Sequence, residues 1–299
     1  MLKRIGIDLG GTNISIGLIS EKFEILQKII LPVGQSKNVI DDILLGITRL
    51  ISDDVAGVGI GIPGIVDSNL GVIVYTPNLD LAGVKIREAI EREIKTPVKI
   101  SNDANCAALG EVLKGAAFGE KNAVMLTLGT GVGAGIIIDN RIYSGELSAA
   151  GEIGHMILTV DGRKCGCGRN GCFEAYASAT ALIKDTSEVV GNFSDSLLLK
   201  NKIDGKTIFE AAELGDVCAK IVVERYIKYL SEGIISVINI FRPGKIVLGG
   251  GIAESGGFLI NPVNEYIKGK CLGGKFLPAT PVVKAILGND AGIIGAAML

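Results

Sequence analysis

Ile5-Gly6-Ile7-Asp8-Leu9-Gly10-Gly11-Thr12 is the stretch of this 299-residue chain that decides its fold. Its first five residues predict a short buried strand, and residues 14–18, which alternate apolar and small side chains, predict a second one. The glycine-rich turn of a dinucleotide-binding fold opens a helix, whereas this turn joins two strands. The stretch therefore predicts a β-hairpin whose turn can present backbone N–H groups to an anion.

The same pattern recurs 119 residues later, because that shift places Leu9 on Leu128 and Gly10 on Gly129. Residues 124–133 again read as a strand and a glycine turn, and residues 134–138 as the returning strand. A repeated unit of this kind predicts two related lobes with a nucleotide between them, as in actin-like ATPases. A triple glycine at residues 249–251, after another predicted strand, is a third candidate for nucleotide contact.

The intervening segments predict an α/β protein. Apolar periodicity predicts helices at residues 40–51, 84–94, 104–114 and 217–240, and a strand at residues 97–100. We expect an N-terminal lobe over residues 1–115, with a helix at about 290–299 packing back on it, and a larger lobe over 116–289. Gly205-Lys206-Thr207 resembles the end of a nucleotide-binding loop, but residue 200 is a lysine where that motif needs glycine, so we expect Thr207 to cap a helix.

Composition excludes several classes of function. A net charge of −2 and a pI near 5.7 provide no general attraction to nucleic acid or anionic membranes, and 5% aromatic residues offer few surfaces for stacking bases. No apolar stretch reaches the ~20 residues of a membrane span, and the N-terminus has no leader-peptide pattern. We therefore expect a cytoplasmic protein that binds neither nucleic acid nor membrane.

His155, the only histidine, stands ten residues before a cysteine cluster at Cys165, Cys167 and Cys172. Three thiolates and one imidazole make a complete tetrahedral set for Zn2+, and closed sites of this type are structural. A disulfide or unliganded thiols are the alternatives. Nothing in the sequence looks secreted, however, and cysteine clusters in cytosolic proteins more often bind metal or take part in catalysis. The sequence therefore predicts a zinc-binding loop over residues 155–172.

Four carboxylates are placed where they could take part in chemistry. Asp8 ends the first strand, where it could hold Mg2+ through water. Asp103 lies where a predicted strand meets a helix, and it is either a helix cap or a general base for phosphoryl transfer. Glu152 and Glu174 flank the predicted zinc loop, either as solvated surface residues or as acceptors for the hydroxyls of a polyol.

Taken together and in order, the motifs resemble those of the ROK family (repressors, open reading frames, sugar kinases), and the resemblance covers essentially the whole chain. The matching stretches are residues 8–13 (DLGGTN), 61–64 (GIPG), 102–105 (NDAN), 128–131 (LGTG), 152–155 (EIGH), 165–172 (CGCGRNGC), 249–251 (GGG) and 288–292 (GNDAG).

This resemblance implies two actin-like (ribonuclease H-like) lobes and ATP-dependent phosphorylation of a hexose, with glucose as the expected substrate and glucose 6-phosphate as product. Asp103 matches the base that deprotonates the sugar hydroxyl, and ATP, Mg2+ and structural Zn2+ are the implied cofactors. The implied sugar contacts are Gly64, Asn78, Asn102, Asp103, Glu152, His155 and Glu174. The implied nucleotide contacts are Asp8, Gly10, Gly11, Thr12, Asn13, Thr130, Gly131, Gly249 and Gly250. The implied zinc ligands are His155, Cys165, Cys167 and Cys172, and the implied assembly is a homodimer.

Two departures from the family pattern leave the identity of the sugar open. Many glucokinase-like relatives have Gly-Trp shortly after Pro-Asn-Leu, but the chain contains no tryptophan, and Ser101 stands where relatives often carry an acidic residue. N-Acetylmannosamine, fructose, allose and N-acetylglucosamine therefore remain alternative substrates. A sugar-responsive repressor of the same family is the alternative from another class; it would need a helix-turn-helix segment ahead of the first glycine turn, for which the seven residues before Asp8 leave no room.

Overall fold

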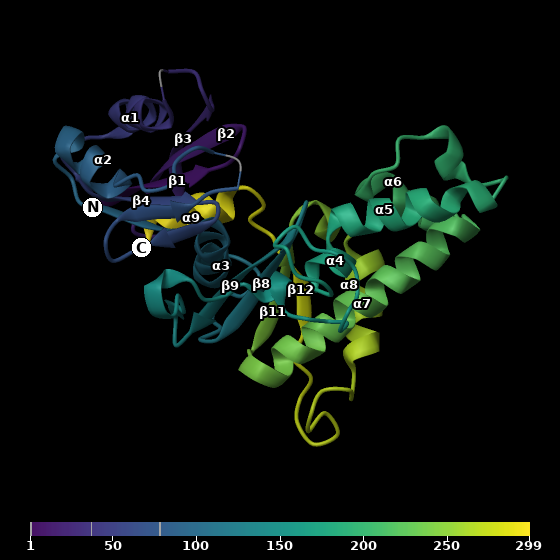
Figure 1. Ribbon diagram of the computed structural model, residues 1–299. Helices are drawn as coiled ribbons and strands as arrows, with labels where there is room; N and C mark the ends of the chain where they lie inside the picture. Colours follow the sequence, from purple (N-terminus) through teal and green to yellow (C-terminus); the bar gives the residue numbers. More distant parts are fainter. Residues whose placement is uncertain (1, 37, 78) are drawn as a thin grey trace. The chain divides into compact units, whose positions relative to one another are not determined.

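The computed structural model describes residues 2–36, 38–77 and 79–299, so Asn78, a predicted sugar contact, lies outside the described residues. The chain forms two compact units (Figure 1). The first consists of Met1–Ala123, Gly135–Gly151 and Ile286–Leu299, and the second of Val124–Ala134 and Glu152–Ala285. Each unit combines helices with strands of a five-stranded sheet.

The predicted N-terminal hairpin is confirmed. Strands β1 (Lys3–Leu9) and β2 (Asn13–Ile19) are antiparallel, with Leu9 opposite Ile14 on either side of the glycine turn. The sheet continues through β3 (Ile25–Pro32) beside β2, and through β4 (Val55–Ile62) and β7 (Val98–Asn102), in the order β3-β2-β1-β4-β7. Because β1, β4 and β7 are parallel, their carboxyl ends meet at one edge of the sheet, where Asp8 and Asn102 lie.

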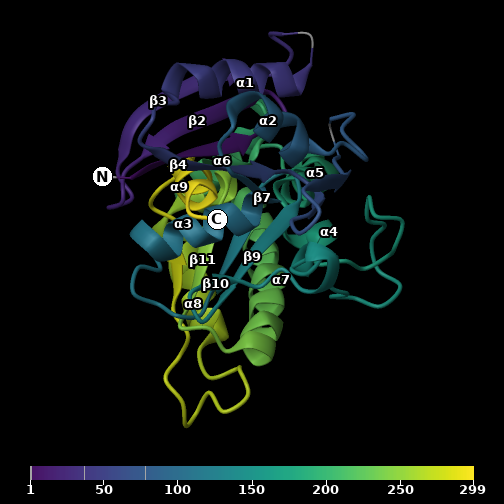
Figure 2. The ribbon, with the colours of Figure 1, turned by 90° about the vertical axis from the view of Figure 1, so that its left-hand side faces the viewer.

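The two faces of this sheet carry different side chains, because residues alternate between faces along a strand. Ile5, Ile7 and Ile60 belong to a core that also contains side chains of helices α1 (Val39–Leu50) and α2 (Ile86–Ile94). The glycines between them leave the opposite face open for helices α3 (Asp103–Lys114) and α9 (Asp290–Ala297). Figures 1 and 2 both show α1 and α2 on one side of the sheet, and α3 and α9 on the other.

Glycine is required where α9 meets this face. A Cβ atom on Gly6 would lie 1.9 Å from the carbonyl oxygen of Ile293, and one on Gly59 would lie 1.7 Å from that of Ala296. Helices α3 and α9 approach as closely, because a Cβ on Gly295 would lie 1.7 Å from the Cys106 carbonyl oxygen. These contacts bring the first turn of α9 close to Asp8.

The second sheet repeats the plan of the first. Its strands are β8 (Ala123–Leu128), β9 (Val132–Ile138), β10 (Arg141–Ile142), β11 (Lys245–Gly249) and β12 (Val282–Lys284), in the order β10-β9-β8-β11-β12. β1 ends at Leu9 and β8 at Leu128, while β2 begins at Asn13 and β9 at Val132, so the 119-residue repeat seen in the sequence holds for the elements. The actin-like duplication is therefore present in the topology.

The remaining helices of the second unit are α4 (Glu174–Ala177), α5 (Ala179–Val189), α6 (Gly205–Glu213), α7 (Val217–Phe241) and α8 (Gly257–Ile267). This unit also contains short 3-10 turns at Ile153–His155, Val190–Asn192, Leu197–Lys200 and Gly251–Ser255. The first unit contains a further 3-10 turn at Glu146–Ser148 and the strand pair β5 (Ile65–Asp67) and β6 (Val72–Tyr75). The prediction that Thr207 caps α6 is wrong by three residues, because Asp204 is the cap. The Thr207 hydroxyl accepts a hydrogen bond from the backbone N–H of Asp204. Within the described ranges, no helix combines the length and apolarity needed to cross a membrane.

Candidate functional site

The first glycine turn is closed by a hydrogen bond from the Gly10 N–H to the Asn13 carbonyl oxygen, at 2.9 Å. Gly11, Thr12 and Asn13 are exposed. A turn of this kind leaves backbone N–H groups free to contact phosphate oxygens, and small residues allow the phosphate to approach closely. The geometry suits the predicted nucleotide contact.

Asp8, at the end of β1, lies in a strongly perturbed environment. Burial and, to a smaller extent, the negative charge of Asp103 raise the pKa of Asp8 to about 6, although the ammonium group of Lys28 opposes both effects. Lys28 is itself paired with Asp290 at 2.5 Å, so its charge is shared. Two carboxylates that destabilise each other's ionised forms favour a cation between or beside them.

The helix cap at the end of β7 is Asn102 and not Asp103. The Asn102 side-chain oxygen accepts from the Asn105 N–H at 3.1 Å, and its amide nitrogen donates to the Gly64 carbonyl oxygen at 3.0 Å. Asp103 is the first residue of α3, where burial raises the pKa of its carboxyl group against the effect of local hydrogen bonds. A carboxylate that is not needed as the cap and has a raised pKa suits a general base.

Gly64 supports this arrangement through its backbone conformation. Its φ is +97°, and a Cβ atom there would lie 2.2 Å from the Tyr75 carbonyl oxygen, so only glycine fits. The first unit thus brings together four predicted site residues, Asp8, Gly64, Asn102 and Asp103, together with the first glycine turn.

In the second unit, the predicted zinc ligands converge. One ligand atom from each of His155, Cys165, Cys167 and Cys172 lies within 4.8 Å of all the others. His155 Nδ1 is 3.7 Å from the Cys165 sulfur, and the sulfurs of Cys167 and Cys172 are 3.6 Å apart. A tetrahedral zinc site with bonds of about 2.3 Å has edges of about 3.8 Å, so the four residues fit Zn2+.

The protonation of the thiols also fits a metal site. Burial and the adjacent thiols raise the pKa of Cys165 to about 12, whereas a backbone hydrogen bond from Arg169 lowers the pKa of Cys167. Such neighbouring thiols cannot all ionise unless a cation compensates their charge, and binding Zn2+ would displace their protons.

Glu174 connects the cluster to the second glycine turn. One carboxylate oxygen accepts from the Val132 N–H at 3.0 Å, and the other lies 3.6 Å from the Cys165 sulfur. A Cβ on Gly131 would lie 2.2 Å from the Glu174 carboxylate, so a larger residue there would displace that carboxylate. Glu152 lies on the other side of the cluster, with its carboxylate 4.0 Å from His155 Nε2.

The other predicted nucleotide residues lie around the same turn. The Gly129 N–H donates to the Gly131 carbonyl oxygen at 3.0 Å, and the Thr180 hydroxyl donates to the Thr130 carbonyl oxygen at 2.8 Å. Gly250, with φ +85°, packs against the end of β8, because a Cβ there would lie 2.5 Å from the Leu128 carbonyl oxygen. Gly249, at the end of β11, is buried beside it.

An ion-pair network that the sequence interpretation missed anchors the zinc-binding segment. The Asp185 carboxylate, on a residue only 5% exposed, pairs with Arg163 at 2.9 Å and Arg225 at 3.2 Å. The Arg163 guanidinium lies 4.6 Å from the ring centre of Tyr176. The backbone carbonyl oxygen of Arg163 accepts a hydrogen bond from the N–H of Gly171, which precedes the predicted zinc ligand Cys172. The available signal was Asp185 itself, which lies among the buried residues of α5.

Glu111 was also missed. Its side chain is fully buried in α3 and accepts from the backbone N–H groups of Ala116 at 2.6 Å and Leu287 at 2.9 Å. It also accepts from Ile286 at 3.1 Å. Glu111 therefore ties α3 to the chain that leads into α9.

Comparison with known proteins places this geometry in a family. The sequence profile of the ROK family matches residues 4–299. The glucokinase of Halalkalibacterium halodurans is 35% identical over 99% of this chain and 94% of that protein, and that of Thermotoga maritima is 35% identical over 100% and 97%. The xylose repressor of Bacillus spizizenii is 32% identical over 97% of this chain and 75% of its own length.

Solved structures agree with these relatives. The ROK family glucokinase of Streptomyces griseus, in complex with glucose and AMPPNP, superposes with a TM-score of 0.83 at 33% identity, over 99% of this chain and 98% of that one. The ROK hexokinase of Thermus thermophilus gives a TM-score of 0.83 at 32% identity, over 99% and 97%. On the evidence of its motifs, its duplicated sheets, its histidine–cysteine cluster and these matches, the chain belongs to the ROK family.

Proposed function

We propose that this protein phosphorylates glucose on its C6 hydroxyl group with ATP, giving glucose 6-phosphate and ADP, and that Asp103 is the general base. Curated glucokinases match it across nearly their whole length, and a ROK hexokinase shares its fold, so the protein is an ATP-dependent hexose kinase. Glucose as the preferred hexose and the roles of individual residues are the parts proposed here.

The observation that supports this mechanism best is the environment of Asp103. Asn102 has taken the capping role, and burial raises the pKa of the Asp103 carboxyl group. A carboxylate with a raised pKa accepts a proton more readily. In the proposed step, Asp103 takes the hydroxyl proton as the sugar oxygen bonds to the γ-phosphorus, and the bond from that phosphorus to the bridging oxygen of ADP breaks.

The sugar would be oriented by Asn102 and Gly64 in the first unit, and by Glu152, His155 and Glu174 in the second. His155 supports this role because its Nδ1 faces the Cys165 sulfur. With Zn2+ on Nδ1, the ring proton must reside on Nε2, which can then donate to a sugar hydroxyl oxygen. The zinc site would in this way fix the tautomer of a substrate-binding residue while remaining structural.

The nucleotide would be bound by the glycine turns. Gly10, Gly11, Thr12, Asn13, Thr130 and Gly131 are the residues proposed to contact the phosphates, and Gly249 and Gly250 those proposed to lie near the adenosine. Mg2+, when bound, neutralises charge on the transferring phosphoryl group, and Asp8 is the residue proposed to hold it. A homodimer is part of the same proposal, and light scattering would test it.

A coupled ADP-release assay over a panel of hexoses and N-acetylhexosamines tests the substrate, and Asp103→Asn tests the base. We expect the highest kcat/KM for glucose, and for Asp103→Asn a loss of about 10²- to 10⁴-fold in kcat with unchanged nucleotide affinity. Asp54→Asn, which alters a surface carboxylate paired with Lys3, is the matched control and should keep full activity. Turnover of Asp103→Asn within a few-fold of the unmodified protein would remove Asp103 from the mechanism. A higher kcat/KM for another sugar would refute glucose as the preferred substrate but leave the proposed base untouched.

A further inference from the structure

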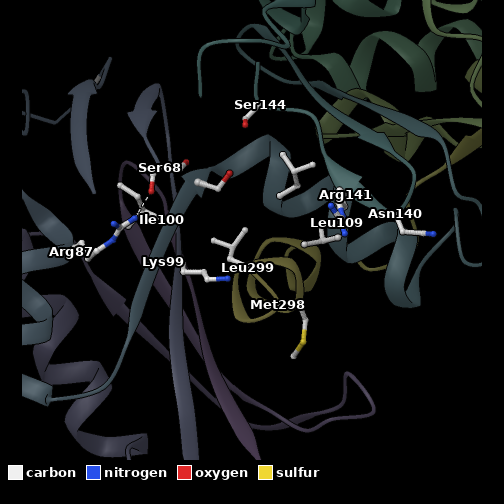
Figure 3. Close-up of a pocket in the computed structure, with 12 residues that line it drawn as sticks. Ser68, Arg87, Lys99, Ile100, Leu109, Asn140, Arg141, Ser144, Met298 and Leu299 are labelled. Carbon is white, nitrogen blue, oxygen red and sulfur yellow. Dashed lines mark hydrogen bonds between the residues drawn. The ribbon is translucent and has the colours of Figure 1, made fainter. Parts of the chain in front are cut away.

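The first unit contains a pocket of about 380 Å³ that none of the predicted nucleotide, sugar or zinc residues lines. Figure 3 shows Arg87 and Lys99 on one side of it, Asn140 and Arg141 on the other, and Leu299 between them. The volume lies within the range of roughly 300 to 1,000 Å³ that is typical of small-molecule sites. The pocket is therefore large enough to be a ligand site in its own right.

The charged groups along its wall are mostly cationic. Arg87, Lys99 and Arg141 contribute three positive charges, and none of the lining side chains is a carboxylate. The side chains of the described lining residues therefore give the pocket an excess of positive charge. Because the whole chain carries a net charge of −2, this concentration is local and not a consequence of composition.

No carboxylate side chain in the described part of the chain pairs with these three cationic side chains. Within the described residues, Lys99 and Arg141 make no side-chain hydrogen bond or ion pair, and both are exposed at the rim. Arg87 donates to backbone carbonyl oxygens only, those of Ser68 and, at 2.9 Å, Asn69. Its Nε is buried without an acceptor in the described part of the chain. Arg87 is thus fixed in place while its charge is not neutralised.

The rest of the lining is suited to an organic molecule. The side chains of Ser68, Ser101 and Ser144 supply hydroxyl groups, while the buried Leu109 supplies an apolar surface. Guanidinium and ammonium groups bind phosphate through charge-assisted hydrogen bonds, and serine hydroxyls pair with the hydroxyls of a polyol. An inorganic anion would use only the cationic part of this wall.

We infer that this pocket binds a small organic phosphate of the sugar-phosphate class, at a site separate from the proposed catalytic residues. The phosphate would lie between Lys99 and Arg141, with Arg87 adding positive charge at the far side of the pocket, and the carbon skeleton would lie against Leu109. The inference rests on the charge and lining of the pocket and not on the proposed function.

Isothermal titration of the full chain with fructose 1,6-bisphosphate tests the inference, with inorganic phosphate and fructose as reference ligands. We expect one bisphosphate per chain, weaker binding of inorganic phosphate, and no binding of fructose to this site. Removing one charge-assisted contact should weaken bisphosphate binding by at least about tenfold. We therefore expect Lys99→Gln and Arg141→Gln each to raise the dissociation constant by at least this factor. Both residues are exposed, so the folded structure should be retained, which the unfolding midpoint would verify.

Lys22→Gln is the matched control, because Lys22 is an exposed lysine of the same unit that does not line the pocket. The Lys22→Gln variant should bind the bisphosphate with unchanged affinity, and so should the Asp103→Asn variant. Absence of binding, or binding that the Lys99→Gln/Arg141→Gln double variant leaves intact, would overturn the site. Equal affinity for inorganic phosphate would overturn its assignment to an organic phosphate.

Discussion

Replacing Asp8 by Asn should make the protein more stable and less active at the same time. Burial, with the charge of Asp103, raises the pKa of Asp8 from 3.8 to about 6, so the folded state holds this proton more tightly than the unfolded chain does. A pKa shift of about two units lowers the free energy of unfolding by roughly 3 kcal/mol at pH 7, because the carboxyl group must ionise in the folded state at that pH. Asparagine avoids that cost, but it cannot supply the charge proposed to hold Mg2+.

The direction of the pKa shift determines how the stabilisation by Asp8→Asn depends on pH. Between about pH 4 and pH 6 the folded protein binds more protons at Asp8 than the unfolded chain, so this residue lowers the free energy of unfolding as pH rises. The gain from Asp8→Asn should therefore be up to about 3 kcal/mol at pH 7 and well under 1 kcal/mol near pH 4. Urea unfolding at both pH values, without nucleotide or Mg2+, measures it, and the coupled assay measures the accompanying loss of activity.

Asp54→Asn serves as the control from the same unit. Hydrogen bonds from Lys3 and Ser52 lower the pKa of Asp54, so its charge favours the folded state and asparagine should give no gain at either pH. The reasoning would be refuted if Asp8→Asn were no more stable than the unmodified protein at pH 7. It would also be refuted if the gain were the same at both pH values.

Three further outcomes are expected. Stripping zinc with a chelator should weaken sugar binding and expose the loop around Val132 to faster hydrogen exchange, because Glu174 links that loop to the cluster; unchanged exchange would contradict this link. Asp185→Asn should cost about 2 kcal/mol and speed zinc release to a chelator several-fold, since two arginines lose their carboxylate partner, whereas the exposed Glu188→Gln should release zinc at the normal rate. Glu111→Gln should lower the free energy of unfolding by about 2 kcal/mol, because its hydrogen bonds to backbone N–H groups lose their charge, and urea midpoints identical to those of the exposed Glu24→Gln would contradict it.

The local features of the fold could be predicted because their signals are local. Alternating residues around a glycine turn specify each hairpin, and the 119-residue repeat between Leu9 and Leu128 carries over to the two sheets. The histidine–cysteine cluster was recognisable because three of its four residues lie within eight positions of one another. Asp103 could be singled out from its place at a strand end, but only the structure shows that Asn102 has taken the capping role.

Features that depend on distant segments could not be predicted. Glu111 binds backbone groups 175 and 176 residues further along the chain, and no periodicity indicates such a partner. Arg163 and Asp185 meet because the zinc-binding segment folds against α5, which their spacing alone does not specify. The cationic pocket is assembled from separate segments, and each of its charged residues reads in the sequence as an ordinary surface residue.

The place of α9 in the first unit also determines the order in which the chain can fold as it is made. Residues 286–299 complete a unit whose other parts end at Gly151, while all of the second unit precedes Ile286. The part of the glycine-lined face that α9 covers therefore stays exposed while the ribosome translates residues 152–285. Multidomain chains generally fold from the N-terminus as they emerge. In this protein the unit that is begun first is therefore the last to be completed.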